Sequence, residues 1–120
     1  MENSAASSSA VSNSLRSRLR LPMFGAPMFL VSSPALVTEQ CKAGIVGVLP
    51  CLNLRPSQAF NEALVQICAD LRQWDEHNPN AKAAPLAVNL MVHPSNARLE
   101  EDLAIICEQR VEIVITSLNP

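Results

Sequence analysis

From residue 21 onward, short apolar runs alternate with segments in which apolar residues recur every three or four positions. The apolar runs predict strands at 23–26, 45–49, 85–92 and 111–117. The run at 45–49 is unbroken, which is typical of a parallel strand covered on both faces. The periodic segments predict helices at 34–43, 60–71 and 99–107. Because the connections are short, we expect parallel crossovers and an α/β fold.

Residues at the helix ends support these assignments. Ser33 can cap the first helix, Pro34 suits its first turn, and Gly44 can end it in the left-handed conformation. The last helix is expected to begin after Ser95 or Asn96 as its cap.

That last helix also carries an apolar face and an acidic first turn. The residues expected to face the core are Leu99, Leu103, Ile106 and Cys107. The acids at 100–102 lie where the helix dipole favours negative charge, so we expect all three to be solvated.

The number of strand–helix units predicts a larger architecture. Residues 21–120 hold about three and a half βα units. Eight units at this rate need roughly 230 residues, close to the ~250 of a (β/α)8 TIM barrel. We therefore expect the first half of such a barrel, in a chain that ends directly after a strand as a fragment. The rival doubly wound fold is disfavoured, because Gly25 stands alone where a GxGxxG turn would be expected.

The first 20 residues differ in composition from the rest. They are rich in serine and arginine, and Glu2 is their only acid. Such a segment buries too little apolar surface to offset its ordering entropy, so we expect residues 1–20 to be a disordered tail and 21–120 to be the domain. An organelle transit peptide is the alternative, because such peptides are also rich in serine and arginine.

Composition and charge exclude several classes of function. A net charge of −2 and 3% aromatic residues argue against nucleic-acid binding. Each apolar run is too short to span a membrane. The four cysteines have neither CxxC nor zinc spacing, so we expect no metal site, no disulfide framework and a reducing cytoplasmic compartment.

Ligands of parallel α/β folds bind at the carboxyl ends of the strands, so polar residues there are the candidates for chemistry. Asn89 interrupts an apolar strand, and a buried amide must be paired by protein or by ligand. Thr116 and Ser117 offer hydroxyls at the end of the last strand. His93 is a possible base or phosphate contact, although a loop histidine is more often polar surface. Cys51 is a weak candidate for a reactive thiol.

Four segments resemble the amino-terminal half of nitronate monooxygenase, formerly called 2-nitropropane dioxygenase. They are GAPMFLVS at 25–32, KAGIVG at 42–47 with Leu52-Asn53 following, AVNLMVH at 87–93 and IVITSL at 113–118. Together they cover about residues 21–118 in the order of the family.

The resemblance implies a barrel enzyme that contains FMN and oxidises alkyl nitronates with O2. By this resemblance, Ala26, Pro27 and Met28 would line the isoalloxazine ring, and Asn89 would form a hydrogen bond with the flavin. Thr116 or Ser117 would lie beside the ring. The family's catalytic histidine belongs to later strands, so no catalytic residue is expected before Pro120, and His93 does not take that role.

Two other functions stay open. A related flavin barrel enzyme could act on another substrate, such as an enoyl-thioester. Alternatively, the chain is a non-catalytic, truncated partner subunit that associates with a second half, or with itself, through exposed sheet edges.

Overall fold

Three strands form one open parallel sheet in the computed structural model, which describes residues 3–118 and their side chains from residue 9 onward. The strands are β1 (Gly47–Pro50), β2 (Leu86–Met91) and β3 (Ile113–Ser117), in the order β1-β2-β3. Gly47 is paired with Leu86, and Ala87 with Ile113, so all three strands end at the same edge. We refer to this edge as the carboxyl edge.

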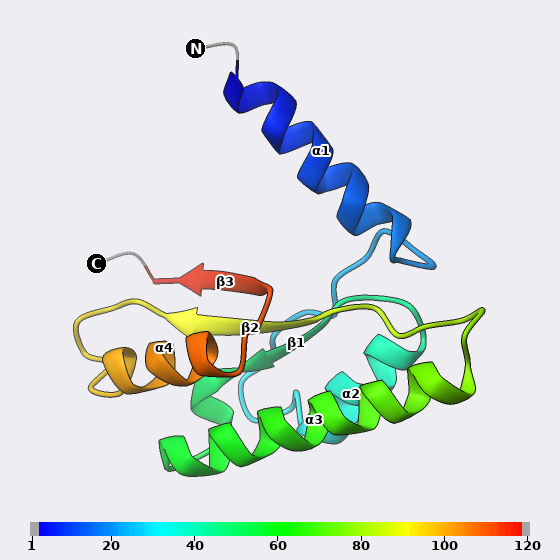
Figure 1. Ribbon diagram of the computed structural model, residues 1–120. Helices are drawn as coiled ribbons and strands as arrows, with labels where there is room; N and C mark the ends of the chain where they lie inside the picture. The colour runs from blue at the N-terminus through cyan, green and yellow to red at the C-terminus, as the bar shows by residue number, and fades with distance from the viewer. Residues whose placement is uncertain (1–2, 119–120) are drawn as a thin grey trace.

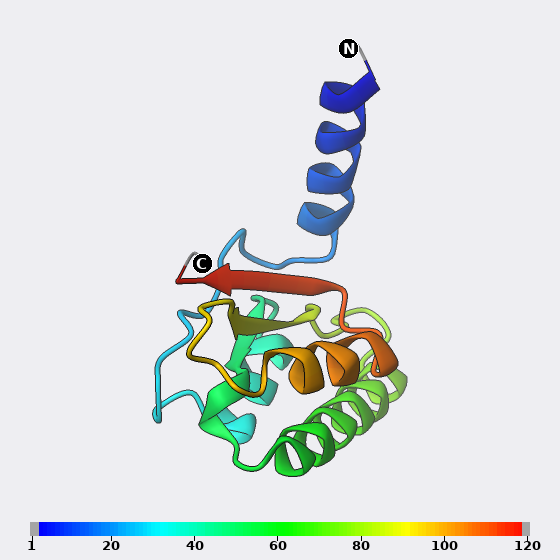
Figure 2. The ribbon, with the colours of Figure 1, turned by 90° about the vertical axis from the view of Figure 1, so that its left-hand side faces the viewer.

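Three helices cover one face of the sheet. They are α2 (Pro34–Lys42), α3 (Ser57–His77) and α4 (Leu99–Glu108), and a short 3-10 turn, η1 (Cys51–Asn53), follows β1. Both ribbon views place α2, α3 and α4 on the same side of the strands (Figures 1 and 2). The helices at 34–43 and 60–71 are therefore confirmed, the second as part of a longer helix.

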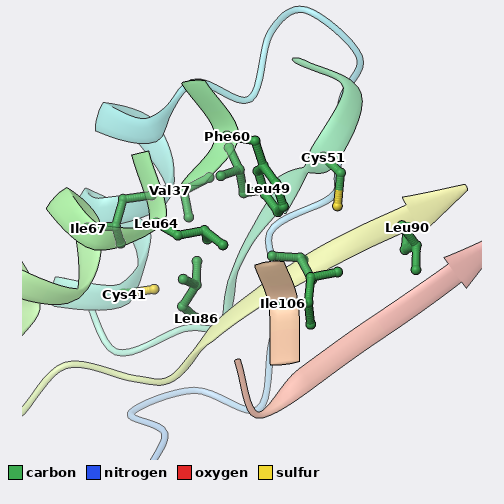
Figure 3. Packing of buried hydrophobic residues seen from close by; sticks show 11 residues of the cluster. Val37, Cys41, Leu49, Cys51, Phe60, Leu64, Ile67, Leu86, Leu90 and Ile106 are labelled. Atoms are coloured by element: carbon green, nitrogen blue, oxygen red, sulfur yellow. The ribbon is translucent and has the colours of Figure 1, made fainter. Parts of the chain in front are cut away.

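The main core lies between this helical layer and the sheet. Leu86, Val88 and Leu90 alternate along β2 and point into the helical layer, as period-two alternation requires. The core cluster, shown in Figure 3, comprises Val37, Cys41, Leu49, Cys51, Phe60, Leu64, Ile67, Leu86, Val88, Leu90 and Ile106. Burying each of the large aliphatic side chains contributes about 1.5–3 kcal/mol, so this layer holds the sheet in place.

The opposite face of the sheet carries a smaller apolar cluster. Val46, Val48 and Ala87 are buried there, and Leu15 and Leu19 pack against them. These two leucines belong to the end of helix α1 (Asn3–Ser17) and the turn after it. The rest of α1 projects away from the sheet (Figures 1 and 2). Composition assigns this segment to a disordered tail, whereas the structure has a helix at Asn3–Ser17.

The prediction that the chain forms the first half of a (β/α)8 barrel is wrong, because the structure has an open sheet of three strands. The segment at 23–26, expected to be the first strand, forms only an isolated bridge between Phe24 and Val46. Proline explains its shortness, because Pro22 and Pro27 flank the segment and neither can donate to a ladder. The α/β class with parallel strands is retained, but the barrel is not.

The signals at the ends of α2 are confirmed. The Ser33 hydroxyl accepts a hydrogen bond from the Leu36 N–H at 3.1 Å. Gly44 follows the helix with φ of +89°, and a Cβ there would lie 2.5 Å from the Arg20 Cβ. Position 44 therefore needs glycine both for its conformation and for the close approach of the N-terminal segment.

Helix α4 differs from its expected orientation. Leu103 and Cys107, expected to face the core, are exposed, whereas Asp102 and Ile106 are buried. The interpretation of Asp102 as a solvated acid is wrong, because its side chain is 0% exposed. The physical reason is an ion pair with Arg98.

Candidate functional site at the carboxyl edge

Asn89 lies near the end of β2, and its amide is joined to β3. Its Nδ2 donates to the Ile115 carbonyl at 3.0 Å, and the Ser117 hydroxyl donates to its Oδ1 at 3.4 Å. These bonds engage one of the two amide protons and one of the two oxygen lone pairs. One donor and one acceptor site therefore remain for a ligand above this face.

The two hydroxyls at the end of β3 are separated by the sheet. Ser117 is paired with Met91 and shares the face of Asn89, because side chains two apart lie on one side of a strand. Thr116 is paired with Leu90, whose side chain is in the helical core, so Thr116 is on the other face. Of these two candidates, only Ser117 is brought to Asn89.

The Ala-Pro-Met turn lies at the same edge. The bridge between Phe24 and Val46 is parallel, and Val46 directly precedes β1. The segment that leads from Phe24 to the turn therefore runs in the same direction as β1. In Figure 2 the blue segment that precedes α2 lies on the side to which the arrow of β3 points. Ala26, Pro27 and Met28 are all exposed. The structure thus offers an accessible, largely apolar turn beside the strand ends.

Two buried or half-buried polar side chains hold this turn in shape. The Ser32 hydroxyl accepts from the Met28 N–H at 2.9 Å and donates to the Ala26 carbonyl at 3.3 Å. Asn53 accepts from the Leu30 N–H and donates to the Met28 and Ser32 carbonyls, each at 3.0–3.1 Å. The turn is therefore pre-organised by its own chain, which lowers the entropy cost of binding a ligand.

Sequence reasoning named the segment that contains Asn53 but assigned neither Ser32 nor Asn53 a role. The available signal was position: Asn53 comes three residues after β1 ends, at the edge where ligands of parallel sheets bind. Its contact with a turn more than twenty residues away could not be read from the sequence.

His93 serves a local turn at this edge. Its Nδ1 accepts from the Ser95 N–H at 3.1 Å and lies 2.8 Å from the Ser95 hydroxyl. The ring is exposed and organises the loop between β2 and α4. His93 thus has the role of a polar surface residue that shapes its own loop.

Cys51 is part of the core. It is 1% exposed, and burial raises the pKa of its thiol to about 12. Burial also raises the pKa of the Cys41 thiol, to about 11. Both groups therefore stay neutral thiols near pH 7, and neither is an activated nucleophile.

A half-buried guanidinium, that of Arg98, holds the loops beneath the edge. Arg98 donates to the Leu54 carbonyl at 2.7 Å, to the Ser57 hydroxyl at 2.9 Å and to the Asp102 carboxylate at 2.9 Å. It also donates to the Cys51 carbonyl at 3.4 Å. Arg98 thus joins η1, α3 and α4, and it allows Asp102 to occupy a core position. Asp102 Oδ2 has no hydrogen-bond partner in the described part of the chain.

The described residues include no group of three or more metal-ligating side chains. None of the helices described between residues 3 and 118 has the length and apolar character needed to cross a membrane. Comparison with protein-family models, with curated proteins and with solved structures gives no match.

Proposed function

We propose that the carboxyl edge binds the isoalloxazine ring of FMN, in an oxidoreductase that resembles nitronate monooxygenase and uses O2 to oxidise an alkyl nitronate. The observation that carries the proposal is the arrangement of Asn89 and the Ala26–Met28 turn. A half-buried amide with unused hydrogen-bonding capacity lies at the same strand ends as a pre-formed apolar turn. Ligand sites combine an apolar lining with a few placed polar groups in this way.

The residues of this edge fit a flavin ring in their chemistry. Pro27 and Met28 offer apolar surface to one face of a planar ring, and Asn89 can exchange hydrogen bonds with the ring's edge. FMN, when bound, supplies the electron-transfer chemistry, while the protein orients the ring and excludes water. Ser117 orients the Asn89 amide through its hydroxyl. Thr116 is not part of this proposal, because it is on the helical face.

The test is a titration with riboflavin, whose fluorescence reports burial of the ring and which carries no phosphate. We expect Met28→Lys to weaken binding about tenfold or more, since burying a methionine contributes about 1.5–3 kcal/mol and 1.4 kcal/mol is tenfold in affinity.

Met23→Lys is the matched control for this titration. Met23 and Met28 belong to the same segment and are 52% and 40% exposed, but Met23 comes before the Phe24–Val46 bridge, whereas Met28 comes after it. Equal affinity of the two variants, or no quenching of riboflavin by the wild-type protein, would refute the flavin site.

A second proposal concerns self-association. Strand β3 is at the edge of the sheet, and it contains neither proline nor charge between Ile113 and Ser117. Such a strand presents free backbone donors and acceptors and invites pairing. We propose that a second copy of this chain pairs with it, because two β3 strands related by a two-fold axis would satisfy each other's backbone groups symmetrically.

A further inference from the structure

Two adjoining concavities lie at the opposite edge of the sheet, where the strands begin. The larger has a volume of about 850 Å³ and lies between the turn that follows α1 and the loop that precedes β2. The smaller, about 210 Å³, shares Arg18, Asp75 and Ala83 with it. Figure 1 shows the turn and the loop on the side from which the strands start. We call this region the amino-edge cavity.

Positive charge is concentrated around the amino-edge cavity. The chain as a whole has nine basic and eleven acidic residues and a net charge of −2. Two acids line the cavity, Asp75 and Glu112. The basic residues that line it are Arg18, Arg20, Lys42, Arg72, Lys82 and Arg110. A mildly acidic protein thus gathers most of its cations at one edge, which focuses a positive potential there.

The acids of the cavity are already engaged. Glu112 is bound by Arg18 through two hydrogen bonds, of 2.6 and 3.1 Å. Asp75 Oδ1 accepts a hydrogen bond from the Ala83 N–H at 2.7 Å. In contrast, the side chains of Arg20 and Lys82 form no hydrogen bond or ion pair with any residue of the described chain. The larger concavity is therefore lined by two free cations, one from the turn after α1 and one from the loop before β2.

We infer that the amino-edge cavity binds a small molecule that carries two or more linked phosphate groups. Arginine and lysine together suit this ligand, because the guanidinium fork matches phosphate oxygens and the ammonium supplies a point charge. The volume of about 850 Å³ lies within the range of roughly 300–1,000 Å³ that small-molecule sites have. A ligand with two or more linked charged groups can interact with both Arg20 and Lys82, which line the same concavity.

Binding would join the N-terminal segment to the domain. Arg20 belongs to that segment and is attached to the domain by its N–H, which donates to the Gly44 carbonyl at 2.9 Å. Lys82 belongs to the loop between α3 and β2. A phosphate ligand between them adds a second connection, so it should slow the opening of the Arg20–Gly44 hydrogen bond.

The test is isothermal titration calorimetry of the full chain with sodium tripolyphosphate at fixed ionic strength. The variant Arg20→Gln/Lys82→Gln removes the two free cations without breaking a described contact. The control Arg16→Gln/Arg55→Gln changes the net charge equally, and both of its positions are exposed and outside the cavity. We expect the first pair to weaken binding about tenfold or more and the control less than about twofold, since charge-assisted hydrogen bonds act at short range.

Hydrogen exchange at the Arg20 N–H gives a second readout. Tripolyphosphate should slow this exchange in the wild type and in the control but not in Arg20→Gln/Lys82→Gln. Absence of saturable binding to the wild type, or equal weakening in both variant pairs, would overturn the inference. Riboflavin carries no phosphate, so its titration separates this inference from the flavin proposal, which concerns the other edge.

Discussion

At the residue scale, Asn89 shows why a polar residue in an apolar strand needs its neighbours before it can be interpreted. An unpaired buried amide costs free energy, so the sequence establishes only that a partner must exist. The structure supplies half of that pairing from Ile115 and Ser117. The remaining hydrogen-bonding capacity is what makes the residue a candidate for ligand contact.

Arg98 is the residue whose removal should affect stability most. Arg98→Met leaves the buried Asp102 carboxyl without its ion-pair partner, so we expect a loss of about 3–5 kcal/mol in the free energy of unfolding, measured by urea denaturation. The double variant Arg98→Met/Asp102→Leu removes both charges and should recover most of that loss. If the double variant were as unstable as the single one, the loss would not come from the uncompensated carboxylate.

Thiol reactivity should follow burial along the chain. Cys107 is exposed, Cys68 is half-buried, and Cys41 and Cys51 are buried. With iodoacetamide at pH 8, mass spectrometry should find Cys107 alkylated first and Cys41 and Cys51 only after unfolding, because burial raises the pKa of both buried thiols. Early labelling of Cys51 in the folded protein would contradict its place in the core.

At the element scale, local signals predicted α2 well and α4 poorly. Ser33, Pro34 and Gly44 lie at the two ends of α2 and act on the nearest turns of the helix. The start and the end of α2 could therefore be predicted from the sequence. The buried face of α4 depends instead on Arg98 reaching carbonyls more than forty residues away. The segment at 23–26 has strand-like composition, but its prolines limit the pairing that tertiary structure allows.

The attachment of the N-terminal segment should depend on acid pH. The hydrogen bond from Arg18 lowers the pKa of Glu112 below its ordinary 4.5. A lowered pKa in the folded state means that the stabilisation is present above pH 4.5 and is lost as the pH falls through the native value.

Urea denaturation across this pH range checks the effect. Arg18 and Glu112 are both partly exposed, so their ion pair is weakened by solvent. We therefore expect Glu112→Gln to lower the free energy of unfolding by only about 0.2–1 kcal/mol at pH 6. The difference between the variant and the wild type should shrink as the pH falls below 4.5. The control Glu101→Gln, at an exposed position on α4, should show no such convergence. A constant difference between Glu112→Gln and the wild type at all pH values would exclude the ion pair as its cause.

At the scale of the whole molecule, the sequence predicts that the strands are parallel. It does not predict how many of the apolar runs form full strands. Alternating apolar runs and helical periods specify βαβ connections, which the sheet order confirms. Counting those runs as complete barrel units failed, because one of them makes only a bridge. The two edges of the sheet also differ in charge, and this follows from side chains that are distant in the sequence.

The open edge of β3 predicts concentration-dependent association. Val114→Lys places a charge on the edge strand and should keep the protein monomeric, while the wild type forms dimers in size-exclusion chromatography with light scattering. Val65→Lys is the matched control, because Val65 on α3 is 48% exposed and Val114 is 40% exposed. A monomeric wild type at about 1 mM, or dimers of Val114→Lys, would reject pairing through β3.

The central claim is that the carboxyl edge binds a flavin ring, and the most direct test maps the site on the protein. In nuclear magnetic resonance of the 15N-labelled chain titrated with riboflavin, we expect shifted amide signals at Met28, Asn53, Asn89 and Ser117. Signals at the amino edge, such as those of Gly44 and Ala83, should stay in place. Saturating riboflavin that leaves the carboxyl edge unchanged, or that shifts the amino edge instead, would contradict the account.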